Sequence, residues 1–163
     1  FKRDLLGFAA ELTAIFKERF GIELFVAYGV LIGFTRSDGF IGHDDDLDMA
    51  YVSARATKAE IYQQSVEVVD ALLAMGFEVK FSTYGQYKVL KKVGKHRLKV
   101  EIFVGWEEAD KTFLSFAIDQ GVDTSIFLPL GKKRFMGVEL PIPADPVAVC
   151  AATYGPEWRT PNP

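Results

Sequence analysis

The sequence is poor in cysteine, with one residue, Cys150, in a chain of 163 residues. A single cysteine forms no disulfide within the chain, which excludes the small disulfide-stapled class of secreted proteins and agrees with a reducing compartment. Because Cys150 lies in an apolar helical pattern, we expect it to be a buried structural thiol rather than a nucleophile.

Long apolar runs are also missing. The longest, residues 24–32, is interrupted by Tyr28 and Gly29 and falls short of the ~18 residues that cross a bilayer. The opening segment is charged and amphipathic, which is not the pattern of a signal peptide. We therefore expect a soluble, cytoplasmic domain with no membrane span.

The chain has no excess of basic residues, since its net charge is −3 and its pI is about 5.4. General nucleic-acid binders are usually basic, so no nucleic-acid partner is expected. Basic residues do gather between positions 91 and 99, where they form either an anion-attracting patch or a solvated hairpin. They are Lys91, Lys92, Lys95, His96, Arg97 and Lys99.

Apolar and aromatic residues, in contrast, are plentiful at 49% and 13% of the chain. This composition supports a packed core, and the length is that of one ordinary domain. The chain begins with Phe1 rather than Met. We expect one domain over residues 1–163, excised from a longer protein or produced by processing.

The spacing of apolar residues predicts an α+β domain with a mixed sheet. Helices are expected over residues 2–19, from Val30 to about Arg36, from a capping box at Thr57 to Gly76, and over 145–153. Strands are expected over residues 24–28, 46–51, 77–82, 87–93 and 97–104, and near 112–118 and 134–140.

Four carboxylates crowd into five positions, at Asp44, Asp45, Asp46 and Asp48. Their mutual repulsion indicates that a cation occupies the space between them. Asp46 and Asp48 are two apart on the expected strand and project from one face; Asp44 joins them if the strand begins early, and Asp45 points away. All-oxygen ligands suit Mg²⁺ or Mn²⁺. The alternative is a solvated acidic turn, but an idle Asp48 among apolar neighbours is unfavourable.

Upstream of the acids, Gly29 and Gly33 lie where a strand turns into a helix, so a phosphate can approach that backbone and the helix N-terminus. Alone, such glycines also simply end strands. A glycine turn, a helix and then a strand-borne Asp-x-Asp form the layout of a nucleotidyltransferase-like mixed β-sheet flanked by helices. Glu101, an acid in an apolar strand, is the candidate third acid; alternatively it pairs with Lys88 or Lys99.

These residues carry a resemblance to a known family. The segment from Tyr28 to Asp48 resembles the core motif of the LicD family, which includes bacterial phosphocholine transferases and the animal fukutin and fukutin-related proteins. The ending is similar as well, with Pro143 before the last helix and the run Tyr154-Gly155-Pro-Glu-Trp158 after it. The resemblance covers nearly the whole chain.

The resemblance implies a Mg²⁺-dependent phosphotransferase that modifies cell-surface glycans. Such an enzyme moves a phospho-substituent (phosphocholine, phosphoribitol or similar) from a CDP-activated donor to a glycan hydroxyl and releases CMP. In one hypothesis, the cations held by Asp46, Asp48 and Glu101 bind the donor diphosphate, and an acid nearby takes the hydroxyl proton.

Individual roles follow from the same resemblance. Asp46, Asp48 and the softer match Glu101 are the candidate catalytic acids, and with Asp44 they are the candidate metal ligands. Gly29, Gly33 and Arg36 match the family's phosphate-side residues, and with Tyr28 and His43 they are the candidate substrate-binding residues. Arg36 is expected to hold a phosphate oxygen through its guanidinium; alternatively it is a surface arginine in a turn.

The chain departs from the family pattern just before the acids, where Gly42-His43 replaces the Pro-Trp of many members. His43 either contacts a phosphate or relays a proton, or it is a loop residue. Tyr154 and Trp158 either pack the tail or shape an acceptor pocket. Two other functions stay open: a nucleotidyltransferase that attaches a nucleotide to a small molecule or protein, and a non-catalytic domain that binds a nucleotide or glycan.

Overall fold

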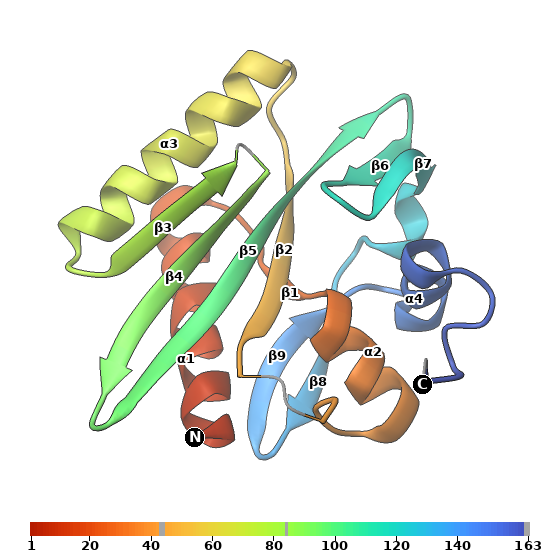
Figure 1. The fold of residues 1–163 in the computed structure, drawn as a ribbon. Coiled ribbons are helices and arrows are strands. Elements are labelled where there is room, and N and C mark those ends of the chain that lie inside the picture. Colours follow the sequence, from red (N-terminus) through yellow and green to blue (C-terminus); the bar gives the residue numbers. More distant parts are fainter. Residues whose placement is uncertain (43–44, 84, 162–163) are drawn as a thin grey trace.

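A mixed β-sheet forms the centre of the computed structural model, which describes residues 1–42, 45–83 and 85–161. Its strand order is β1-β2-β5-β4-β3, and β5 also pairs with β6, which pairs with β7 (Figure 1). β2 and β5 are parallel, whereas the other pairs are antiparallel. The strands are β1 Phe25–Val26, β2 Leu47–Ser53, β3 Glu78–Thr83, β4 Gln86–Val93, β5 His96–Glu108, β6 Lys111–Leu114 and β7 Ile118–Asp123.

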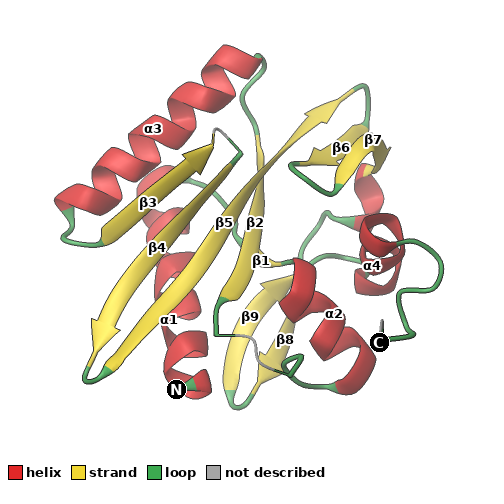
Figure 2. Cartoon of the chain, viewed as in Figure 1, coloured by secondary structure: helices red, strands yellow, loops and turns green. Residues whose placement is uncertain are grey.

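Four α-helices surround this sheet in the described part of the chain, and a separate hairpin of β8 Gly131–Phe135 and β9 Val138–Ile142 packs beside it (Figure 2). The arrangement confirms the predicted α+β class with a mixed sheet flanked by helices. The described helices include none that is long and apolar enough to cross a lipid bilayer. They are α1 Lys2–Ile15, α2 Tyr28–Ser37, α3 Lys58–Ala74 and α4 Pro146–Tyr154.

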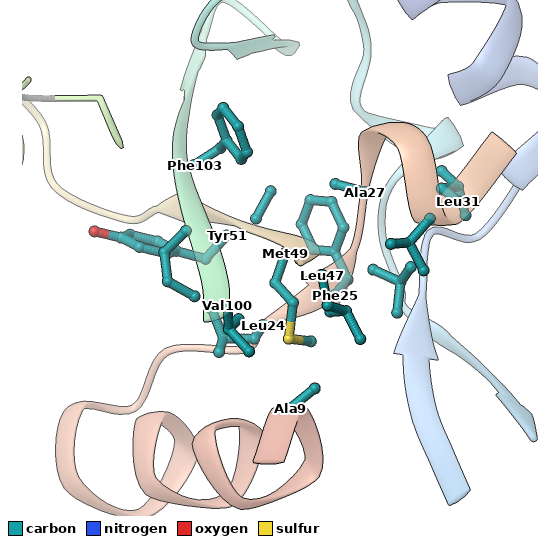
Figure 3. Close-up of a cluster of buried hydrophobic side chains, with 14 of the residues drawn as sticks. Ala9, Leu24, Phe25, Ala27, Leu31, Leu47, Met49, Tyr51, Val100 and Phe103 are labelled. Carbon is teal, nitrogen blue, oxygen red and sulfur yellow. The ribbon is translucent and has the colours of Figure 1, made fainter. Parts of the chain in front are cut away.

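Helix α1 covers one face of the sheet with its apolar stripe, which includes the fully buried Ala9 and Leu12. The predicted helix over 2–19 continues past α1 as a π-helical turn, Phe16–Phe20, and ends at Gly21, which has φ 64°. Figure 3 shows Ala9 directed toward Met49 and its buried neighbours. This face of the sheet, covered by α1 and α3, is called the helix face below.

Strand β2 alternates as its sequence predicts. Leu47, Met49 and Tyr51 are fully buried on the helix face, and Figure 3 shows all three in the core cluster. Asp48 between them is half-buried, and the period of two directs its side chain to the opposite face. We call that opposite face the site face.

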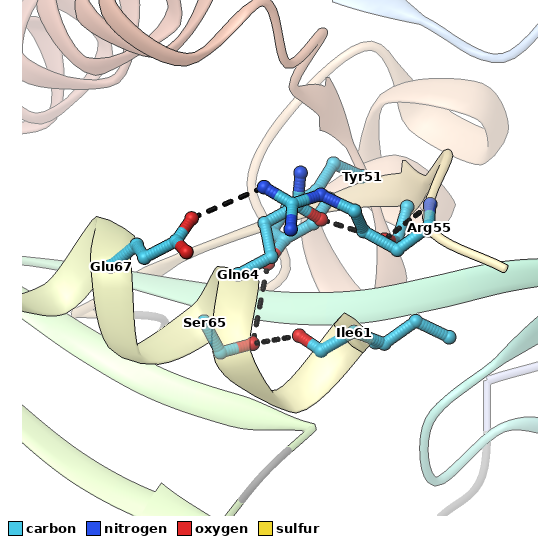
Figure 4. A network of polar contacts seen from close by, with 7 residues as sticks. Tyr51, Arg55, Ile61, Gln64, Ser65 and Glu67 are labelled. Carbon is cyan, nitrogen blue, oxygen red and sulfur yellow. Dashed lines mark hydrogen bonds and ion pairs between the residues drawn. The ribbon is translucent and has the colours of Figure 1, made fainter. Parts of the chain in front are cut away.

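Helix α3 begins at the predicted capping box, in which the Glu60 N–H donates to Thr57 Oγ1 and the Thr57 N–H donates to Glu60. Its buried side includes polar groups that hold it to β2 (Figure 4). Ser53 Oγ donates to Gln64 Oε1 at 2.6 Å, and the hydroxyls of Tyr51 and Ser65 lie 3.5 Å apart. These contacts therefore fix the orientation of helix α3 against β2, the strand that carries Asp48.

The meander β3–β4–β5 agrees with the three strands predicted between residues 77 and 104. The strand expected near 134–140 was wrong, because it spans the turn of the β8–β9 hairpin. Met136 and Gly137 at that turn have φ values of 48° and 85°, which reverse the chain between two short strands. The strand predicted near 112–118 is also interrupted: it covers most of β6, the turn at residues 115–117 and the first residue of β7.

Cys150 in α4 is buried, as predicted. Burial raises the pKa of its thiol from 9.0 to about 11. We expect thiol reagents at pH 8 to modify the native chain roughly 100-fold more slowly than the unfolded chain, because the thiolate is the reactive form. A stopped-flow chromogenic thiol assay with and without denaturant measures this ratio, and equal rates would contradict a buried thiol.

The free energy of unfolding should fall as the pH rises from 9 to 11, because the Cys150 thiol ionises at lower pH in the unfolded chain than in the native chain.

Candidate functional site

Asp48 and Glu101 lie side by side on the site face. In the parallel pair of β2 and β5 they are direct register partners, so their side chains project from neighbouring backbones about 5 Å apart. Asp48 is half-buried, and Glu101 is 8% exposed. Two adjacent carboxylates at this depth need positive charge close by.

The other acids of the cluster lie at the entry to β2. Asp46 precedes the strand, is half-buried and sits two residues before Asp48. Asp45, expected to point away, is exposed and accepts a hydrogen bond from Lys99 Nζ at 2.9 Å. That bond lowers the pKa of the Asp45 carboxyl. The predictions for His43 and Asp44 fall outside the described residues.

Glu101 receives its positive charge from strand β4. Lys88 is its antiparallel register partner, and the Lys88 ammonium lies 3.3 Å from the Glu101 carboxylate. Gln86 Nε2 also donates to Glu101. The ion pair with Lys88 is one of the two pairings that the sequence left open. It places an ammonium group beside Glu101 on the face that Asp48 shares.

The N-terminus of helix α2 meets this acidic pair. The helix begins at Tyr28, two residues earlier than expected, because Ala27 is extended and ends the short strand β1. The Gly29 N–H donates to Asp48 Oδ2 at 3.2 Å, which adds a favourable interaction with the positive end of the helix dipole. Gly29 therefore lies beside Asp48, and its role on the phosphate side stays a prediction.

Tyr28 packs over the site face from the same helix end. Its backbone has φ 47°, an uncommon value for a non-glycine residue. The ring centroid lies 4.1 Å from that of Phe103, two residues beyond Glu101 on β5, and the hydroxyl donates to the Ser115 carbonyl. These contacts orient the first turn of α2 against β5.

Burial raises the pKa of the Tyr28 hydroxyl, and the charges of Tyr154, Asp48 and Glu101 raise it further. The hydroxyl therefore stays protonated at neutral pH. It is suited to donate a hydrogen bond and unsuited to act as a base.

Gly33 occupies a different part of α2 from the one its predicted role implies. It is buried in the middle of the helix, and a Cβ at this position would lie 2.4 Å from the Gly39 carbonyl oxygen. Glycine is needed here because the chain after α2 turns back across the helix. The structure thus gives Gly33 a packing role and does not bring it to Asp48 or Glu101.

Arg36 lies in the last turn of α2, seven residues beyond Gly29. Seven residues of α-helix span about 10 Å, so Arg36 and the acids lie at opposite ends of α2. Arg36 lines a cavity of about 360 Å³ whose opposite wall is the chain after α4. We call this cavity the α2–tail pocket. It is lined by Gly29, Ile32 and Arg36 of α2, by Ile41, and by Tyr154, Glu157, Trp158 and Thr160.

The basic residues of positions 91–99 form the β4–β5 hairpin. Lys91 pairs with Glu11 of α1, Arg97 with Glu78, and Lys99 with Asp45. These pairs offset much of the positive charge, which favours the interpretation as a solvated hairpin.

A divalent cation fits the chemistry of the acidic pair. Asp48 and Glu101, with Asp46 at the strand entry, present only carboxylate oxygens, the ligand type that Mg²⁺ and Mn²⁺ prefer. Within residues 1–42, 45–83 and 85–161, no three His, Cys, Asp or Glu side chains already stand together as a metal-binding group. A cation held by Glu101 would share this carboxylate with the Lys88 ammonium, which lies 3.3 Å from it.

The short β1, helix α2, and the acids on β2 and β5 together define a nucleotidyltransferase-type domain. The chain belongs to the LicD/FKTN/FKRP family, whose nucleotidyltransferase domain matches residues 21–145. The match ends before helix α4 and the tail.

The chain is also similar to an uncharacterized protein of Rickettsia typhi, with 28% identity over 141 residues. The aligned region covers 84% of this chain and 41% of that protein. The chain therefore spans about two fifths of the length of this curated relative.

Several residues around the acids escaped sequence reasoning. Gln86 reaches Glu101 through the antiparallel register of β4 and β5, which no local pattern specifies. Glu157 and Thr160 line the α2–tail pocket from a segment without helical or strand periodicity. The Tyr154-to-Trp158 run was the available signal for that wall.

Proposed function

We propose that this domain transfers a phospho-substituent from a CDP-activated donor to a hydroxyl of a glycan, with Mg²⁺ or Mn²⁺ as cofactor. The observation that carries the proposal is the in-register pair of Asp48 and Glu101 at the N-terminus of α2. Family membership supports the transferase class. The two carboxylates could hold the metal ion that neutralises phosphate charge during phosphoryl transfer.

In this proposal Asp46, Asp48 and Glu101 would hold the cation, which neutralises charge on the transferring phosphoryl group when bound. The first turn of α2 would present backbone N–H groups to the donor diphosphate. Tyr28, whose hydroxyl donates to the Ser115 carbonyl, would hold this turn against β5. Lys88 and Lys99, both on the site face, would add positive charge around the phosphates.

The reaction itself exchanges one P–O bond for another. The acceptor hydroxyl oxygen would bond to the phosphorus distal to cytidine, and the bond from that phosphorus to the CMP oxygen would break. The hydroxyl proton would pass to a carboxylate of the site. CMP would leave with the electron pair of the broken bond.

A donor screen tests the proposal. The purified chain is incubated with Mg²⁺, a glycan acceptor, and either CDP-choline, CDP-ribitol or CDP-glycerol, or else ATP, CTP, GTP or UTP. Release of CMP from a CDP donor, absent with EDTA, is the expected result. Release of pyrophosphate from a nucleoside triphosphate would instead indicate nucleotide transfer. No release and no Mg²⁺-dependent thermal shift with any compound would indicate a non-catalytic domain.

Replacing Lys88 with methionine should make the chain more dependent on a divalent cation. The change keeps the apolar stem but leaves the buried Glu101 beside Asp48 without its ammonium partner. In EDTA we expect the free energy of unfolding to fall by about 1–2 kcal/mol, a moderate loss because the lysine is partly exposed. The Tm should fall by roughly 2–8 °C.

Addition of Mg²⁺ should then raise the Tm of Lys88→Met more than that of the wild type, because a cation bound to the native state stabilises it. Differential scanning fluorimetry across a Mg²⁺ series measures both effects. Lys92→Met, at an exposed lysine of the same strand, is the matched control. An equal Mg²⁺ shift in all three proteins would remove Glu101 from the proposed ligand set.

A further inference from the structure

Phe116 combines a strained backbone with an exposed side chain. It lies in the loop of residues 115–117 between β6 and β7, has φ 67° and is 69% exposed. The left-handed region is unfavourable for a bulky residue, and so is the contact of a phenylalanine ring with water. Strain of this kind persists where the surrounding structure fixes it, and it is concentrated at functional sites.

The surrounding structure holds this loop at both ends. The Ser115 N–H and the Ser115 hydroxyl both donate to the Val104 carbonyl of β5, at 3.2 Å and 2.6 Å. The Ser115 carbonyl accepts the hydroxyl of Tyr28 from the start of α2. The pairing of β6 with β7 fixes the other end of the loop. Phe116 is therefore kept in its strained conformation by neighbours that also form the acidic site.

A glycine in the turn before β4 makes room for the loop. The Gly85 carbonyl accepts the Val104 N–H at 2.9 Å. A Cβ on Gly85 would lie 2.3 Å from the Ser115 hydroxyl oxygen and 3.7 Å from the Phe116 ring. Any larger residue at position 85 would displace the loop, so the position of the exposed ring depends on this glycine.

Phe116 lies just beyond the acids on the site face. Phe103 follows Glu101 by two residues on β5, about 7 Å along the strand, so both side chains project from the same face. Figure 3 shows the Phe103 ring on the opposite side of β5 from Val100. The Phe103 ring centroid lies 4.1 Å from that of Tyr28 and 6.5 Å from that of Phe116. The three rings form a continuous aromatic surface beside Glu101.

An apolar cavity of about 220 Å³ adjoins the exposed ring. Its lining includes Gly85 and Ser115, the two residues that position Phe116. A single exposed apolar residue is normal on a protein surface, whereas an exposed ring beside an aromatic-lined cavity is typical of a binding site. The other apolar and aromatic lining residues are Ile61 and Tyr62 of α3, and Val104 and Trp106 of β5.

A sugar ring suits this surface. One face of a pyranose carries mainly C–H groups, which leave water when they stack on an aromatic ring. Its hydroxyls can stay in water or bond to the Lys58 ammonium and the Tyr62 hydroxyl of the lining. A nucleobase also stacks on aromatic rings, but its recognition uses several hydrogen bonds to the base edge. The mainly apolar lining favours the sugar.

We propose that Phe116 and the cavity beside it bind a sugar ring of the acceptor glycan, with Phe116 as the stacking face. The proposal rests on the function proposed above and adds an acceptor subsite next to the acids. Because the Phe103 ring separates Phe116 from Glu101, the bound sugar lies beyond the reacting hydroxyl. Phe116 therefore determines acceptor affinity and does not act in the chemical step.

Sugar binding can be measured without donor or turnover. Saturation-transfer NMR is recorded with the methyl pyranosides of glucose, galactose, mannose and N-acetylglucosamine. Magnetisation should pass from the wild type to the ring C–H protons of the sugar. This transfer should fall roughly 5-fold in Phe116→Gly, the loss of one aromatic stacking contact, and should be retained in Phe116→Trp. In turnover, the acceptor KM of Phe116→Gly should rise by a similar factor while kcat and the donor KM stay within about twofold.

Met136→Gly is the matched control, because Met136 is 57% exposed and has φ 48° at the β8–β9 turn. Glycine relieves the left-handed strain at either position, so the Tm should rise by roughly 2–6 °C in both variants. Only Phe116→Gly should lose the sugar signal. A Tm of Phe116→Gly below that of the wild type would show that the ring serves the fold, and would overturn the proposal.

Three binding results would also overturn it. The first is no transfer from the wild type to any of the four glycosides, and the second is an equal signal in the wild type and Phe116→Gly. The third is weaker binding of CDP to Phe116→Gly, measured by isothermal titration, with unchanged sugar signals, which would place the cytosine ring on Phe116. A sugar signal that depends on Phe116, in a chain that releases no CMP in the donor screen, would support this subsite and refute the transfer reaction.

Discussion

Replacing Asp48 with asparagine is expected to lower kcat/KM for donor turnover on the order of 10³-fold, equivalent to about 4 kcal/mol of transition-state stabilisation. The change removes one negative charge from the pair with Glu101. The asparagine retains a side-chain oxygen that can accept the Gly29 N–H. The Tm should therefore stay within a few degrees of the wild-type value. CMP release over a Mg²⁺ series, together with a thermal melt, measures both quantities.

Asp70→Asn is the control for this substitution, because it makes the same chemical change at an exposed position of α3. Its turnover should equal that of the wild type. A folded Asp48→Asn protein with near-normal turnover would refute the role of Asp48 in catalysis. A large drop in Tm would instead show that the carboxylate acts mainly as a structural partner of α2.

Replacing Gly33 with alanine should destabilise the domain by about 2–3 kcal/mol, the upper part of the range for overpacking a buried position. The added Cβ would lie 2.4 Å from the Gly39 carbonyl oxygen and 3.2 Å from the Ile41 nitrogen. Both contacts are with backbone, so the chain that leads from α2 toward the acids must move. The Tm should fall by roughly 4–12 °C, and turnover should fall with it. Thermal melts and CMP release are the measurements.

Gly7→Ala is the matched control, because Gly7 is exposed in α1 and a Cβ there would meet nothing within 4 Å. It should stabilise the chain by up to about 1 kcal/mol. If Gly33→Ala were tolerated as well as Gly7→Ala, the close approach of residues 39–41 would be disproved. A Gly33→Ala protein with normal Tm and weakened donor binding would instead support the phosphate-side role expected from the sequence.

The part of the acidic site that depends on local sequence periodicity was predictable. Alternation along residues 46–51 predicts which face carries Asp48, and burial of Leu47, Met49 and Tyr51 confirms it. The capping box at Thr57 and the helix predicted over 145–153 likewise form as expected, since each helix start depends on residues within one helical turn.

Features set by distant segments were not predictable in the same way. The partners of Glu101 depend on the register of β4 against β5, which places Lys88 rather than Lys99 opposite it. The requirement for glycine at position 33 depends on how the chain returns across α2. Arg36 looked close to the acids in sequence, but the straight rise of the helix carries it to the far end.

The parallel junction of β2 and β5 has a consequence for how the domain acquires its chemistry. The meander β3–β4–β5 forms between segments that are neighbours in the chain, whereas β2 reaches β5 only across the intervening α3, β3 and β4. Contacts of large sequence separation form late, because closing the longer loop has a higher entropic cost. The two acids therefore meet at the end of folding, and partly folded chains would have an intact meander without the proposed cation site.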